Sequence, residues 1–199
     1  MKRLVIHPEN PQIRHIRAAT EILKTGGLII YPTDSVYGLG CDLSNKNAIE
    51  KIYQCKGHDK RKLLSFICPD LKEISEYAYV PDFAYKIMRR LLPGPYTFIL
   101  NATKRVPRIL LEKRKTVGIR VPDNAVCQAL LTELGRPIIS TSARLSDQPF
   151  LGDPEEIAET FERIAEIFLD SGPGGLESST VIDFTGEEPV VVRQGKGKL

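Results

Sequence analysis

The chain has 199 residues, of which 42% are hydrophobic and 27% are charged, and its formal net charge at pH 7 is +3. These are the values of an ordinary water-soluble globular protein, and the length fits a single domain over residues 1–199. No run approaches 18 apolar residues, and the apolar stretch at residues 4–6 is too short for a signal peptide, so we expect no membrane contact.

The cysteines and histidines show no metal-binding spacing. Cys41, Cys55, Cys68 and Cys127 form no CxxC pair and lie beside apolar or helical sequence. We therefore expect buried, reduced thiols in a cytoplasmic protein. The three histidines form no ligand cluster, so we predict no bound metal.

The charges are unevenly divided along the chain. Residues 1–120 hold 22 basic and 11 acidic residues, whereas residues 121–199 hold 6 basic and 14 acidic residues. This asymmetry indicates an anionic ligand held mainly by the first part of the chain. Two solvated surfaces of opposite charge are the simpler alternative.

Helices and strands alternate through the first half of the sequence. A helix begins at Asn10-Pro11, where a capping residue precedes proline, and ends at Gly26-Gly27. The apolar strand 28–32 follows and leads into a polar loop over residues 33–40. The other elements predicted here are a helix from about 44 to 56, a strand at 63–68, helices at 70–78 and 81–92, and a strand at 96–100.

The second half continues in the same way. A short basic helix or loop follows Val106-Pro107, and a helix over 123–134 ends at Gly135. Another helix opens at Asp153-Pro154 and runs to about Phe161. Strands are predicted at 117–121, 137–140, 164–169, 180–184 and 189–192. The interspersed order predicts an α/β or α+β protein with a mixed sheet.

Hydroxyl groups gather where three strands begin or end. Strand 28–32 leads to Thr33 and Ser35, strand 137–140 leads to Ser140-Thr141-Ser142, and a glycine-rich turn leads to Ser178-Ser179. Hydroxyls and free backbone N–H groups at convergent strand ends hold oxygen-rich ligands. Serine and threonine also favour turns for their own hydrogen bonds, which is the alternative explanation.

Positively charged side chains are the second feature of a possible ligand-binding site. Arg120 lies in an apolar strand, so it is either an edge residue facing water or a charge directed into a cleft. Arg193 ends strand 189–192 in the same way, and a planar guanidinium suits carboxylate or phosphate. Nothing matches GxxxxGK[ST], GxSxG, or a GxGxxG that follows a strand, so a nucleotide would be held by scattered hydroxyls and cations.

Several of these segments together resemble the YrdC-like family, and within it the YciO branch most closely. The matching segments follow the family's order and cover nearly the whole chain: PTDSVYGLG at 32–40, Lys56 with its basic neighbours, PGPYTF at 93–98, TVGIRVP at 116–122, STSA at 140–143, STVID at 179–183 and VRQG at 192–195. The resemblance implies an α/β fold with an open, strongly twisted mixed parallel/antiparallel sheet, flanking helices and a basic concave cavity.

The resemblance also implies an activity and its site residues. Enzymes of this family make L-threonylcarbamoyl-AMP and pyrophosphate from L-threonine, bicarbonate and ATP with Mg²⁺, for the t6A modification of tRNA adenosine 37. By the same resemblance, L-threonine would be held by Thr33, Ser35, Arg120, Ser140 and Ser179. ATP would be held by Lys56, His58, Lys62, Thr116, Ser142 and Arg193. No residue is expected to act as a nucleophile or as a metal ligand.

Three positions depart from the pattern of the synthases. His58 stands where an arginine is usual, Arg144 replaces an asparagine, and Ile67 replaces a histidine on the threonine side. The alternative prediction is therefore a non-catalytic protein that binds tRNA or double-stranded RNA. Its RNA-facing basic surface would consist of Lys60, Arg61, Lys104, Arg105, Lys113, Arg114 and Lys115. The sequence makes no prediction of the oligomeric state.

Overall fold

One mixed β-sheet runs through the molecule, whose structure is a computed structural model that describes residues 1–57, 64–111, 115–146 and 148–199. In the described ranges the sheet has eleven strands in the order β1-β9-β2-β3-β8-β4-β7-β6-β10-β11, and β5 pairs with β6. The strands are β1 Lys2–Val5, β2 Ile29–Tyr31, β3 Gly38–Asp42, β4 Ser65–Ile67, β5 Ala78–Tyr79, β6 Tyr96–Ala102, β7 Thr116–Arg120, β8 Ile138–Ser142, β9 Ile167–Asp170, β10 Thr180–Asp183 and β11 Val190–Arg193.

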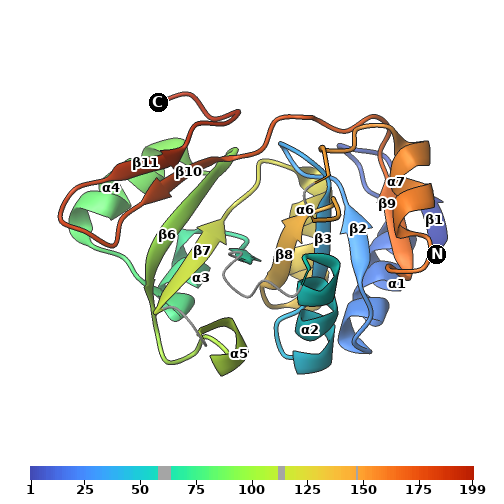
Figure 1. Ribbon diagram of the computed structural model, residues 1–199, viewed down its shortest axis with the longest axis horizontal. Coiled ribbons are helices and arrows are strands. Elements are labelled where there is room, and N and C mark those ends of the chain that lie inside the picture. Colours follow the sequence, from blue (N-terminus) through green and yellow to red (C-terminus); the bar gives the residue numbers. More distant parts are fainter. Residues whose placement is uncertain (58–63, 112–114, 147) are drawn as a thin grey trace.

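The pairing of the strands mixes both directions. Strands β1 and β2 run parallel to β9, β4 runs parallel to β7, and β6 runs parallel to β10, whereas the other pairs are antiparallel. The sheet is twisted so strongly that β6, β7, β10 and β11 form one wing and β2, β3, β8 and β9 form another (Figure 1). The predicted open, mixed α/β sheet is confirmed.

The helices are α1 Ile13–Lys24, α2 Lys46–Cys55, α3 Leu71–Tyr77, α4 Asp82–Leu91, α5 Arg108–Leu111, α6 Ala125–Leu134 and α7 Pro154–Phe161. Asn45, Asp70, Asn124 and Asp153 cap α2, α3, α6 and α7, each accepting a hydrogen bond from a backbone N–H of the first turn. Helix α6 ends at Gly135, whose φ of 73° is the left-handed conformation that glycine favours. No helix in the described ranges is both long enough and apolar enough to cross a bilayer.

Two apolar clusters lie on opposite faces of the sheet. One packs residues of α1 and α6 against the strands from β9 to β4, with Tyr31, Ile67 and Ile138 at its centre. The other packs α2, α3, α4 and α7 against the opposite face, which carries Phe66, Phe98 and Ile119. The buried residues of the first cluster include none from β7, β6, β10 or β11, so α1 and α6 cover only part of their face. The uncovered part of that face is where a ligand could bind.

Several predicted boundaries were wrong. Helix α1 begins at Ile13 with Gln12 as its cap, because Asn10-Pro11 lies in a preceding turn. The polar loop expected at 33–40 ends early, since Gly38 and Gly40 already pair with β8 as part of β3. Strand β8 extends to Ser142, and β9 and β11 are each shifted toward the C-terminus relative to the prediction.

Besides β3, strands β1 and β5 were missed, because each is too short to show a period. Three of the four residues of β1 are exposed, and the segment is a strand because it pairs with β9. Strand β5 has two residues and lies where the first of the two helices predicted at 70–78 and 81–92 was expected to end. Tertiary pairing, rather than an apolar pattern, makes these segments strands.

The strand that carries Arg120 is held by core packing, which gives a test of stability. Ile119 is fully buried at the centre of the sheet, so Ile119→Ala should lower the free energy of unfolding by about 2–5 kcal/mol and Ile119→Val by about 0.5–1.5 kcal/mol. Val190, which is 59% exposed on the edge strand, is the matched control. Val190→Ala should change stability by no more than about 0.5 kcal/mol in denaturant titrations. Equal losses at both positions would contradict this account of the core.

Candidate functional site

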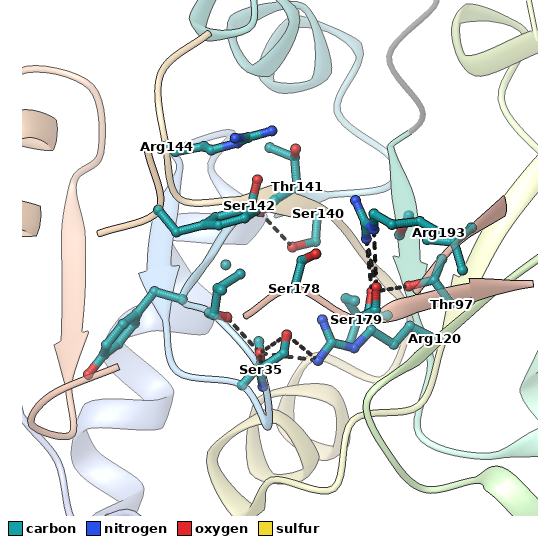
Figure 2. Close-up of a pocket in the computed structure, with 18 of the residues that line it drawn as sticks. Ser35, Thr97, Arg120, Ser140, Thr141, Ser142, Arg144, Ser178, Ser179 and Arg193 are labelled. Atoms are coloured by element: carbon teal, nitrogen blue, oxygen red, sulfur yellow. Dashed lines mark hydrogen bonds between the residues drawn. The ribbon is translucent and has the colours of Figure 1, made fainter. Parts of the chain in front are cut away.

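A cavity of about 610 Å³ lies on the uncovered part of the sheet face, between the two wings (Figure 2). Residues that lie directly opposite one another on paired strands have their side chains on the same face of the sheet. The pairs Ile67–Arg120 and Thr97–Val181 therefore continue, into the cavity, the sheet face that α1 and α6 cover. The lining is rich in hydroxyls, from Thr33, Ser35, Tyr37, Ser65, Thr97, Ser140, Thr141, Ser142, Ser146, Ser178 and Ser179. The cations among its described lining residues are Lys56, Arg120, Arg144 and Arg193.

The loop between β2 and β3 forms one wall. Thr33 Oγ1 donates to the carbonyl of Val36 at 2.6 Å and accepts from the backbone N–H of Ser35 at 3.1 Å, which fixes a tight turn. A second loop, which carries Gly175, packs directly against this turn. A Cβ added at Gly175 would lie only 2.1 Å from the carbonyl oxygen of Ser35. Only a glycine allows so close an approach of the two backbones.

Arg120 projects from the end of β7 toward this loop. Strand β7 lies between β4 and β6, so Arg120 is not an edge residue, and only 7% of the residue is exposed. Its Nη2 donates to Ser35 Oγ at 2.8 Å and to Thr33 Oγ1 at 3.3 Å, and it forms an ion pair with Asp34. The sequence left open whether Arg120 is an edge residue facing water or a charge directed into a cleft. The structure confirms the second interpretation.

A second wall is built by β6, β10 and β11. The hydroxyls of Ser179 and Thr97 lie 2.8 Å apart, and Arg193 holds Ser179 by donating Nη2 to its carbonyl oxygen at 2.9 Å. A Cβ at Gly195 would meet the carbonyl of Ser178 at 2.2 Å, so the C-terminal segment also packs against this turn.

The third wall is the end of β8 and the loop that follows it. Tyr31 donates to Ser140 Oγ at 2.6 Å from beneath the cavity, and burial raises the pKa of the Tyr31 phenol, so it remains a donor. Lys56, which caps the end of α2, donates Nζ to the carbonyls of Ser142 at 2.9 Å and Arg144 at 2.6 Å. This buried lysine therefore fixes the loop that carries Ser142.

Arginines give the cavity its electrostatic character. Arg144 lies with its guanidinium 4.4 Å from the ring centroid of Phe150 and donates to the carbonyl of Gln148. Burial, followed by the charges of Arg144 and Arg120, lowers the pKa of Arg193 below its ordinary value. Since arginine stays protonated at neutral pH, these like charges favour a bound anion.

Most of the predicted site residues come together in this cavity. Those that line it are Thr33, Ser35, Lys56, Arg120, Ser140, Ser142, Ser179 and Arg193. Thr116 does not line it, because it lies at the opposite end of β7 from Arg120. The predicted residues His58, Lys60, Arg61, Lys62, Lys113 and Arg114 lie outside the described residues. The ligand assigned to each residue stays a prediction.

Other residues of the cavity were not found from the sequence. Thr97 and Ser65 are single polar residues in apolar strands, and only the strand pairing shows that they face the ligand side. Phe150 lies in a loop whose sequence gave no signal of direction. Ile67, where a histidine was expected by family resemblance, is 2% exposed and packs into the cluster of α1 and α6.

The donors of the cavity do not form a metal site of the protein's own. The described lining residues include no carboxylate, and the described chain has no group of three or more His, Cys, Asp or Glu residues that could hold an ion. Mg²⁺ prefers carboxylate and phosphate oxygens. The described lining residues therefore offer a magnesium ion no carboxylate ligand.

Fold and cavity define an α/β protein with a hydroxyl-lined, cationic pocket. The family model named for Sua5, YciO and YrdC, described as telomere recombination, matches residues 21–195. The chain is 48% identical over 196 residues to the uncharacterized protein YciO of Escherichia coli K12, covering 98% of this chain and 95% of YciO. The threonylcarbamoyl-AMP synthase of Pyrococcus abyssi is 33% identical over 183 residues, covering 90% of this chain and 54% of that enzyme. The chain therefore belongs to the Sua5/YciO/YrdC family.

Solved structures agree with this assignment. The crystal structure of E. coli YciO matches with a TM-score of 0.95 at 46% identity, covering 100% of this chain and 98% of YciO. The structure of P. abyssi Sua5 complexed with L-threonine matches with a TM-score of 0.91 at 30% identity, covering 98% of this chain and 58% of Sua5. This chain thus corresponds to little more than half of Sua5.

The close packing of Gly175 on Ser35 gives a test of how the first wall is held. Gly175→Ala forces the two backbones apart and should lower the free energy of unfolding by about 1–3 kcal/mol. Gly186 is the matched control, since its nearest neighbour would be 3.9 Å from an added Cβ. Gly186→Ala should change stability by less than about 0.5 kcal/mol in the same denaturant titration. A neutral Gly175→Ala would show that the two loops are not in contact.

Proposed function

We propose that this protein is an L-threonylcarbamoyl-AMP synthase, which uses L-threonine, bicarbonate and ATP and supplies the t6A modification of tRNA adenosine 37. The observation that carries the proposal is the convergence of Ser35, Arg120, Ser179 and Arg193, which are far apart in the sequence, on one cavity. Kinship to the P. abyssi synthase supports the same activity.

The amino-acid subsite of the proposed enzyme lies between the first two walls. Arg120 provides a fixed guanidinium for the carboxylate of threonine, and the hydroxyls of Ser35 and Ser179 lie on either side of it. A Sua5 structure complexed with L-threonine at 30% identity supports an amino acid as the ligand. Thr33 and Ser140 complete the wall of this subsite.

The nucleotide subsite lies beside the loop after β8. Ser142 at the end of β8 and Lys56 at the end of α2 contribute to it, and Arg193 faces them from β11. Arg144 adds a further cation, where the synthases usually have asparagine. Fixed positive charges of this kind neutralise phosphates without needing to reorganise during the reaction. Thr116 would reach ATP only if the nucleotide extends along β7 beyond the described cavity.

The proposed reaction has two bond-forming steps. The neutral amino group of threonine attacks the carbon of bicarbonate, with loss of water, to give a carbamate. A carbamate oxygen then attacks the α-phosphorus of ATP, and the bond to pyrophosphate breaks. The described cavity residues bring the reactants together and stabilise the growing negative charge, which requires no covalent enzyme intermediate. Mg²⁺ bound to ATP would neutralise charge on the phosphates.

The activity is tested by incubating the pure protein with labelled L-threonine, bicarbonate and Mg-ATP. Labelled threonylcarbamoyl-AMP and an equal amount of pyrophosphate should form. Arg120→Ala should weaken threonine binding and Arg193→Ala should weaken ATP binding, each by 10-fold or more, since a charge-assisted hydrogen bond contributes about 1.5–3 kcal/mol. Arg136→Ala is the control, because Arg136 pairs with Asp42 outside the cavity. Absence of adduct and pyrophosphate at high protein concentration would overturn the proposal.

A second candidate is binding of tRNA or double-stranded RNA, which the exposed cations at one end of β6 and β7 favour. Lys104, Arg105 and Lys115 are all exposed, and the carbonyl of Lys115 accepts a hydrogen bond from the backbone N–H of Ala102 at 2.8 Å, so the three residues lie at the same end of two paired strands. Arg105 is partly neutralised by Glu76, at 2.8 Å. This surface could serve the synthase as well as a non-catalytic protein.

RNA binding is tested by its dependence on salt. If three phosphates are neutralised, affinity should fall about 40-fold between 50 and 200 mM salt. Combining Lys104→Ala with Lys115→Ala should lower the slope of log affinity against log salt, whereas Arg120→Ala should leave it unchanged. A flat salt response would rule out this function.

A further inference from the structure

We propose that Asp34 is a positioning residue that holds Arg120 in the orientation needed to bind the carboxylate of the amino acid. This inference rests on the proposed function, since it names the residue that makes its amino-acid subsite work. Asp34 itself is not among the residues that line the cavity.

The hydrogen bonds of Arg120 are made on one side of its guanidinium. Within the described structure Nη2 makes all of its side-chain hydrogen bonds, to Asp34, Ser35 and Thr33. Nε is buried without a partner, and Arg120 lines the cavity. A guanidinium held through one nitrogen keeps its plane and still offers donors to a carboxylate.

Asp34 is itself fixed from two other parts of the fold. Its Oδ2 accepts a hydrogen bond at 2.9 Å from the backbone N–H of Asp123, which precedes α6. Its backbone carbonyl accepts at 2.6 Å from Nζ of Lys196, in the C-terminal segment. Asp34 is therefore anchored by its side chain to the loop after β7 and by its backbone to the C-terminal segment.

Burial makes the ion pair hard to rearrange. The side chains of both Arg120 and Asp34 are only 9% exposed. Removing one partner of a buried pair leaves the other charge without compensation, which is strongly unfavourable. Without the charge of Asp34, Arg120 would keep only the two hydroxyls, and its guanidinium would be free to turn away from the position that receives the ligand.

The opposite role for Asp34 is competition with the substrate carboxylate for Arg120. Competition would require Asp34 to leave when the ligand binds. Its second oxygen is held by Asp123, and it lies outside the cavity lining, so the structure favours positioning. The two roles predict changes of opposite sign in affinity.

The experiment measures binding of L-threonine and of ATP to Asp34→Asn by calorimetry, together with synthase kinetics. We expect the Kd and KM for L-threonine to rise by 10-fold or more, with the Kd for ATP unchanged and kcat changed less than KM. Asp34→Glu, which keeps the charge, should recover part of the affinity. Asp42→Asn is the matched control, because Asp42 is also a buried carboxylate paired with an arginine, Arg136, whose side chain is 37% exposed outside the cavity. That variant should lose stability without losing threonine affinity.

Tighter threonine binding by Asp34→Asn would identify Asp34 as a competitor, and unchanged binding would deny it any role at the subsite; either result overturns the proposal. The Nε–H resonance of Arg120, assigned by its loss in Arg120→Lys, gives a readout that needs no ligand. It should be sharp in the natural protein and broadened in Asp34→Asn. If the natural protein does not bind threonine, the synthase function fails, and an unaltered resonance would separately show that Asp34 does not position Arg120.

Discussion

A charged side chain buried in the middle of a sheet is the feature around which this cavity is organised. Arg120 lies on an interior strand, and the side chain is compensated by Asp34 and two hydroxyls from the β2–β3 loop. A buried guanidinium is tolerated only where its charge is paired. The loop is therefore required to close over β7, and the first wall of the cavity forms as a consequence.

The cavity exists because two helices cover only part of one sheet face. Helices α1 and α6 pack on the strands from β9 to β4, and the opposite face is covered by the larger cluster. The strong twist turns β6, β7, β10 and β11 out of their reach (Figure 1). Short side chains such as Ser65 at the start of β4 and Thr97 on β6 leave room for a ligand.

Charge and shape together define what this cavity would hold. Four cations and many hydroxyls line it, with no carboxylate among its described lining residues. Much of this polar surface is already fixed by the protein, as when Lys56 binds two loop carbonyls and Arg193 binds Ser179. Side chains that are held before a ligand arrives lose little entropy on binding it. The same arrangement suits the amino-acid and nucleotide ligands of the proposed function.

The sequence by itself determined the longer elements, the mixed α/β class and the residue types of the site. Local signals can be read from the sequence without knowledge of the fold. They are the apolar periodicity of the elements, helix caps such as Asn124 and Asp153, and helix-ending residues such as Gly135. Strands β1 and β5 and the direction of Arg120 depend on partners far away in the chain, and only the tertiary structure decided them. The contact of Asp34 with Asp123 and Lys196 is of the same kind, because hydrogen bonds between distant segments leave no period in a sequence.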